Sequence, residues 1–121
     1  MSQSFRKYWR DPVQGRTWFN YNLPGIVVKR PSSSVSSVIV TVCEYKLAGG
    51  IFGGAGSLVR GDANIWVSNV HPYIRVNSQD LIEQNGGIEF VVNVDWGSPL
   101  LVATTITVFD EDVQVEPGEE V

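Results

Sequence analysis

The sequence predicts an all-β protein: an antiparallel β-sandwich, immunoglobulin-like or jelly-roll-like, with extended N- and C-terminal arms. Several short segments alternate apolar and polar residues with a period of two and are rich in β-branched residues. Clusters of Gly, Pro, Asn and Ser separate these segments, as turns between short strands would. The chain has 121 residues, enough for one domain that buries a core.

The first half of the expected sandwich contains three predicted strands. Residues 26–30 form a first strand that ends at Pro31 and the serines after it. Residues 35–45 carry apolar side chains on both faces, which is typical of a central strand buried on both sides. Residues 63–76 read as a strand that breaks at Pro72, because proline lacks the N–H that a central strand needs.

The second half is predicted from the clearest alternation in the chain, over residues 88–96. This pattern places Trp96 on the apolar face, so we expect it to be buried, whereas Trp66 is exposed or faces a second sheet. Residues 100–109 form the last strand, and residues 96–99 suit a hairpin connection before it. Residues 78–84 are expected to form one helical turn.

Charge divides the chain more sharply than its net value of −4 suggests. Residues 1–30 hold six bases and one acid, whereas residues 89–121 hold eight acids and no base. We therefore expect a basic aromatic arm at 1–22, a sandwich domain at 23–109 and an acidic tail at 110–121. Opposite charges at the two ends favour contacts between copies of the chain.

The candidate binding residues are aromatic, basic or acidic side chains of these arms, plus one phenylalanine in a glycine-rich segment. Interleaved bases and rings suit a protein groove, a sugar or single-stranded nucleic acid, and the rings could equally fold back onto the core. The acidic pI of about 4.8 disfavours nucleic acid. The predicted partner-binding residues are Arg6, Lys7, Tyr8, Trp9, Arg10, Arg16, Trp18, Tyr21, Phe52, Asp110, Glu111 and Asp112.

Three motifs point to no cofactor or metal. The glycine-rich segment 47–59 lacks the Gly-Lys-Ser/Thr ending of a phosphate loop, so Phe52 is expected to dock into a partner or return to its own core. The acidic run at 110–112 lacks the spacing of an EF-hand loop. Residues 60–62 spell Arg-Gly-Asp, which we interpret as an ordinary turn.

Catalysis is not expected, because the chain has one histidine and one cysteine. His71 would need a nucleophile such as Ser68 or Cys43 and an orienting acid such as Asp62, and spacing does not bring them together. Cys43 is expected to be a small buried apolar residue. The sequence shows no signal peptide and no transmembrane run, which predicts a cytoplasmic or particle-associated protein without a membrane partner.

These observations favour a structural protein that is not an enzyme. In this hypothesis a β-sandwich subunit associates with its own copies or with other protein subunits through its arms, in a virion or phage-like particle. The alternative is a carbohydrate- or protein-binding module that uses surface aromatics. Residues expected in a sugar site are Asn20, Tyr21, Asn22, Asn64 and Trp66.

Overall fold

A computed structural model describes residues 2–23, 26, 28–29, 34–47, 57–74, 86–109, 111, 113 and 117–118. All regular structure in these residues is β-strand, and none of it is a helix that could cross a membrane. The strands are β1 (Gln3–Tyr8), β2 (Gly15–Leu23), β3 (Val28–Lys29), β4 (Ser34–Val35), β5 (Val38–Lys46), β6 (Ser57–Leu58), β7 (Asn64–Tyr73), β8 (Gly86–Asp95) and β9 (Val102–Val108).

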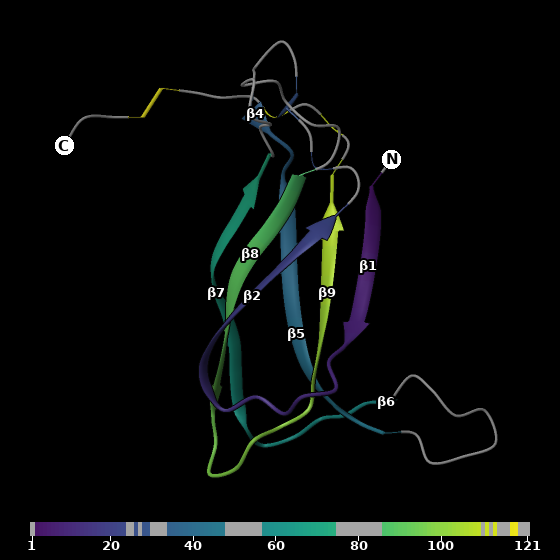
Figure 1. The fold of residues 1–121 in the computed structure, drawn as a ribbon, viewed down its shortest axis with the longest axis vertical. Helices are drawn as coiled ribbons and strands as arrows, with labels where there is room; N and C mark the ends of the chain where they lie inside the picture. Colours follow the sequence, from purple (N-terminus) through teal and green to yellow (C-terminus); the bar gives the residue numbers. More distant parts are fainter. Residues whose placement is uncertain are drawn as a thin grey trace.

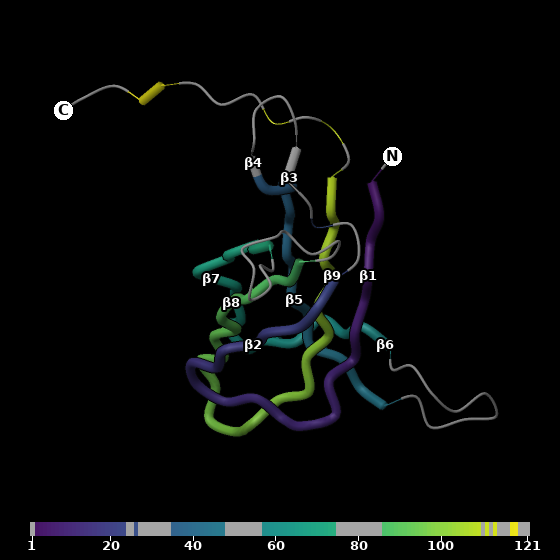
Figure 2. Tube along the Cα trace, turned by 45° about the horizontal axis from the view of Figure 1, so that its top comes forward, coloured from purple at the N-terminus to yellow at the C-terminus, as the bar shows by residue number. Residues whose placement is uncertain are grey.

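The strands form two main antiparallel sheets. One sheet has the order β1-β9-β5-β6 and the other has the order β2-β8-β7, while β3 and β4 pair with each other. Figure 1 shows β2 running obliquely to β9 and β5, and Figure 2 shows the three-stranded sheet curling away from the other. The predicted all-β class and the antiparallel pairing are therefore confirmed for the described residues.

Both sheets contribute to one hydrophobic core. From β8, the alternate residues Ile88, Phe90 and Val92 are fully buried, and Ile106 of β9 is fully buried in the same cluster. The sequence alternation over residues 88–96 thus marks the inner face of the central strand of the smaller sheet. Val13, between β1 and β2, and Leu100, between β8 and β9, exchange two backbone hydrogen bonds of 2.8 and 2.9 Å. These bonds hold the two connecting segments together.

The N-terminal segment does not extend from the domain as an arm. Residues 3–8 are β1, paired along their whole length with β9, and residues 15–23 are β2, paired with β8. The physical reason is a period-two pattern within the basic segment itself: Phe19 and Leu23 lie on the inner face of β2 and are buried. The charged side chains of this segment remain exposed, so the strands bury their apolar residues without burying a charge.

Other local expectations also differ from the structure. Ile39 on β5 is 53% exposed, so this strand is not buried on both faces. Trp96 is 46% exposed because β8 ends at Asp95, before the tryptophan. The connection over 96–99 joins strands of different sheets, so it is not a hairpin turn.

Pro72 lies within β7 and does not end it. This strand pairs only with β8 among the described strands, and an edge position tolerates a missing N–H. The irregularity occurs earlier, at a bulge between Ser68 and His71 where Asn69 has φ 54°. The expected helical turn at 78–84 lies outside the described residues, and the expected first strand is described only as β3.

Candidate functional site

The first candidate surface is the open edge of β1. Among the described strands, β1 pairs with β9 alone. The N–H of Trp9, just after the strand, donates to the carbonyl of Val102 in a 3.1 Å hydrogen bond. Because backbone groups alternate in direction along a strand, Ser4, Arg6 and Tyr8 direct their N–H and C=O groups away from β9. These groups form a template on which another strand could pair.

Bases surround this edge. Arg6, Lys7 and Arg10 are exposed, with Asp11 the one acid beside them in the sequence. The Arg6 side chain reaches the neighbouring strand β9, where its Nε donates to the hydroxyl of Thr105 at 2.8 Å. The Lys7 ammonium lies 4.2 Å from the centre of the Trp9 ring, a cation–π contact. The open edge of β1 is therefore electropositive.

Three predicted anchors on this segment are used inside the protein instead. Tyr8 packs edge-on against Tyr45 at 5.1 Å between ring centroids, and Trp9 packs against Phe19 at 4.5 Å. Tyr21 lies edge-on to Trp9 at 5.7 Å. Trp9 and Tyr21 link the end of β1 to β2, whereas Tyr8 packs on β5 within the larger sheet. All three rings stabilise the fold and are not free to fill a partner's pocket.

The polar groups of these rings differ in whether they form hydrogen bonds. The indole N–H of Trp9 donates to the hydroxyl of Thr104 at 2.9 Å, and the hydroxyl of Tyr45 donates to the carbonyl of Trp9 at 2.6 Å. The hydroxyl of Tyr21 is buried without a hydrogen bond of good geometry. Burial raises the pKa of Tyr21, and the nearby Thr104 hydroxyl offsets part of that rise.

The second candidate surface is the outer face of the three-stranded sheet, which we call the tryptophan face. It carries Trp18 from β2, 55% exposed, and Trp66 from β7, 45% exposed. Trp18 pairs with Val91 and Trp66 pairs with Asn93, so the two indoles flank β8 on opposite sides. Val91 points to this outer face and is nevertheless fully buried, so neighbouring side chains cover it.

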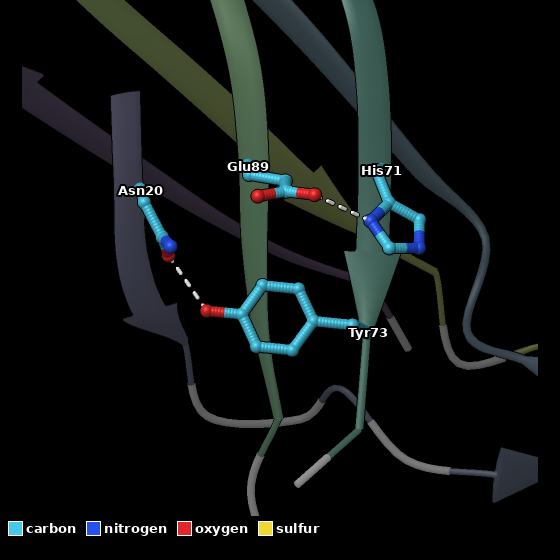
Figure 3. Close-up of polar contacts among 4 residues, drawn as sticks. All are labelled: Asn20, His71, Tyr73 and Glu89. Carbon is cyan, nitrogen blue, oxygen red and sulfur yellow. Dashed lines mark hydrogen bonds and ion pairs between the residues drawn. The ribbon is translucent and has the colours of Figure 1, made fainter. Parts of the chain in front are cut away.

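Hydrogen bonds fix the polar side chains of the tryptophan face. The amide nitrogen of Asn93 donates to the Ser68 hydroxyl at 3.0 Å and to the carbonyl of Trp66 at 3.3 Å. Figure 3 shows two further contacts: the Tyr73 hydroxyl donates to Asn20 Oδ1 at 2.6 Å, and His71 Nδ1 lies 2.8 Å from Glu89 Oε1. Both contacts cross between strands and hold the side chains in one arrangement.

A third feature is a small open hollow of about 180 Å³ at the far end of β5. The Arg60-Gly61-Asp62 turn lines it together with Glu44 and Trp96. The Glu44 carboxylate lies directly over Gly61, so the turn packs against its own chain. Arg60 and Asp62 are exposed on the rim of this shallow hollow, which encloses no ligand-sized space.

Cys43 and His71, two of the residues that catalysis would need, lie on different sheets. Cys43 is half-buried on β5 of the larger sheet, where its thiol contacts the carbonyls of Glu44 and Val59 at 3.3 and 3.6 Å. His71 lies on the tryptophan face of the other sheet and contacts Glu89. Over the described ranges, no group of three His, Cys, Asp or Glu side chains is close enough to hold a metal ion.

Of the twelve predicted binding residues, the structure therefore leaves Arg6, Lys7 and Arg10 at one surface and Arg16 and Trp18 at another. Glu111 is exposed, while Phe52, Asp110 and Asp112 lie outside the described residues. For the sugar site, Asn20, Asn22, Asn64 and Trp66 share the tryptophan face by register, whereas Tyr21 points to the core. The chain matches no protein-family model, no curated protein and no solved structure.

Proposed function

We propose that the protein is a non-enzymatic assembly subunit, a β-sandwich that joins copies of itself into a multi-subunit particle, such as a virion or a phage-like particle. The contact is an added strand: the acidic segment 110–121 of one copy pairs with the open edge of β1 in the next. The observation that carries this proposal is the electropositive edge of β1, with which no second strand of the described residues pairs.

Charge determines which strand this edge accepts. A second copy of β1 would bring Arg6, Lys7 and Arg10 against the same bases, so pairing between two β1 strands is opposed. Segment 110–121 contains six acids and no base, and its sequence alternates as Val-Gln-Val-Glu over residues 113–116. An acidic strand of this kind complements the edge in both charge and backbone hydrogen bonding.

The symmetry of such an assembly follows from its two different surfaces. An edge on one copy and a segment on the other make a head-to-tail contact, which closes into a ring or continues as a filament. Because the charged groups are exposed, salt weakens the contact, since the Debye length falls from about 10 Å at 0.1 M to about 3 Å at 1 M. This sensitivity distinguishes the contact from an apolar interface.

The test uses charge exchange and absolute mass from light scattering on a sizing column. A basic-edge variant, Arg6→Glu with Arg10→Glu, and a tail variant, Asp110→Lys with Glu111→Lys and Asp112→Lys, should each be monomeric. Mixing the two variants should restore oligomers, because each then offers a surface of opposite charge to the other. Combining all five substitutions in one chain should restore assembly as well.

The matched control is Arg16→Glu, which reverses an exposed base on β2, away from the edge of β1. This variant should assemble as the unaltered protein does. The proposal fails if the unaltered chain is monomeric at every salt concentration, or if the mixed variants stay monomeric while each keeps its native circular dichroism. In that case the bases along β1 serve only to protect an edge from aggregation.

A further inference from the structure

We infer that the tryptophan face binds a neutral oligosaccharide, with Trp18 and Trp66 each stacking on one sugar ring. Both side chains are about half exposed although they are among the most apolar in the chain. Aromatic faces attract the weakly positive C–H groups that line the flat side of a pyranose. This inference uses a surface separate from the edge of β1 and stands independently of the assembly proposal.

The spacing of the two indoles fits a chain-like ligand better than a single sugar. They lie one strand to each side of β8 and two residues apart along it, as their partners Val91 and Asn93 show. With about 4.8 Å between strands and about 3.4 Å per residue, their Cα atoms are about 12 Å apart on a diagonal. One hexose ring cannot lie over both indoles at once, whereas an extended oligosaccharide crossing β8 can.

Exposed polar groups beside the indoles, chiefly Asn20, supply hydrogen bonds for sugar hydroxyls. Asn93 is only 9% exposed, and its amide nitrogen donates to the Ser68 hydroxyl and the Trp66 carbonyl, so Asn93 orders the face and is not itself a ligand contact. Asn20 and Tyr73 are fixed by the bond between them. Side chains that are ordered before binding lose little conformational entropy when the ligand arrives.

The balance of charge on this face favours a neutral ligand. The Glu89 carboxylate is already engaged by His71, and the Arg16 guanidinium lies 5.7 Å from the centre of the Trp18 ring. Asp95 at the end of β8 is a further exposed acid. A nucleic acid would need several bases here, whereas Arg16 is the one arginine or lysine among the residues described on this face.

The experiment measures binding of defined probes through tryptophan fluorescence and calorimetry on the full chain. The probes are the hexasaccharides of cellulose, xylan, chitin and amylose, glucose, an acidic hexagalacturonate and a ten-nucleotide oligothymidylate. At least one neutral hexasaccharide should bind, more tightly than glucose and with an affinity that salt does not change. The Trp18→Ala and Trp66→Ala variants should each weaken this binding at least tenfold.

Trp96→Ala is the matched control, since Trp96 is 46% exposed but lies beyond the end of β8. This variant should bind as the unaltered chain does. Trp18→Leu keeps an apolar cover beside Val91 but removes the aromatic face, so it should fold normally and still lose binding. The inference is overturned if no neutral hexasaccharide binds, if the acidic probe or the oligonucleotide binds better, or if Trp96→Ala weakens binding as much as Trp66→Ala.

Discussion

Two adjacent glycines at the start of β8 should respond very differently to the same substitution. A Cβ on Gly86 would clash with the backbone carbonyl of Tyr73 and lie 2.8 Å from the Cγ2 atom of Ile26. A Cβ on Gly87 would meet only the far end of the Tyr73 ring, 2.5 Å from its hydroxyl oxygen. The backbone of Tyr73, which obstructs a side chain at Gly86, is held by the pairing of β7 with β8. The Tyr73 ring, which obstructs a side chain at Gly87, can rotate away.

The magnitudes follow from this difference. Overpacking against a fixed backbone costs about 3 kcal/mol for Gly86→Ala, and the loss of glycine's freedom in the unfolded chain returns about 0.5–1 kcal/mol. Gly87→Ala displaces Tyr73 and loses its 2.6 Å hydrogen bond to Asn20. That loss is about 1 kcal/mol, which the same entropy term nearly offsets. Gly86→Ala should therefore be less stable than Gly87→Ala by about 2 kcal/mol.

Urea unfolding followed by tryptophan fluorescence measures this difference. With a slope of about 1–3 kcal/mol per molar urea, the two midpoints should differ by about 1 M. In a Tyr73→Ala background, Gly87→Ala should cost nothing, while Gly86→Ala should keep its full cost. Gly97→Ala, where a Cβ would meet open space, is the control and should stabilise by about 0.4–1 kcal/mol. Equal losses at Gly86 and Gly87, or a Gly87 loss that persists without the Tyr73 ring, would refute the argument.

Two further substitutions test the core. Phe90→Ala removes a fully buried ring whose centroid lies 5.5 Å from that of Phe19 and 6.1 Å from that of Tyr21. This substitution should lower the free energy of unfolding, measured in urea melts, by about 3–5 kcal/mol. Tyr21→Phe removes a buried hydroxyl without a hydrogen bond, so the midpoint at pH 7 should stay the same or rise. The raised pKa of Tyr21 means that the folded state holds this proton more tightly than the unfolded state does. Stability should therefore fall as the pH rises above 10.0, the ordinary value, and it should fall less steeply in Tyr21→Phe; identical alkaline profiles would contradict the assignment.

The sequence predicted strands best where apolar and polar residues alternate. Residues 88–95 and 102–108 show this alternation and appear as β8 and β9, although Val91 and Ala103 on their outer faces are buried as well. In β2 the same alternation is present, but the bases and polar residues on its outer face favour a charged arm outside the domain, whereas the structure pairs this segment with β8. The basic composition of residues 1–22 predicts an arm outside the domain, whereas the period-two alternation in residues 15–23 predicts a strand that packs on the core.

The tryptophan face could be predicted only in part, because it depends on which strands are neighbours. Trp66 was expected to be either exposed or against a second sheet, and its alternation with Ile65 and Val67 is consistent with both. That Trp18 lies across β8 from Trp66 follows from the order β2-β8-β7, which periodicity does not contain. The bulge at Asn69 also changes which residues of β7 face outward, and this brings His71 beside Glu89.

The two proposed surfaces are independent in structure, so their tests are independent too. The basic edge belongs to β1 of the four-stranded sheet, and the tryptophan face belongs to the opposite layer of the core. Arg6→Glu with Arg10→Glu changes no residue of the tryptophan face, and Trp66→Ala changes no residue of the edge. Distant sites without shared partners act additively, so each variant should leave the other property intact. If the subunits assemble as proposed, the assembly presents many copies of the proposed sugar site together, and linked copies bind far more tightly than one copy does.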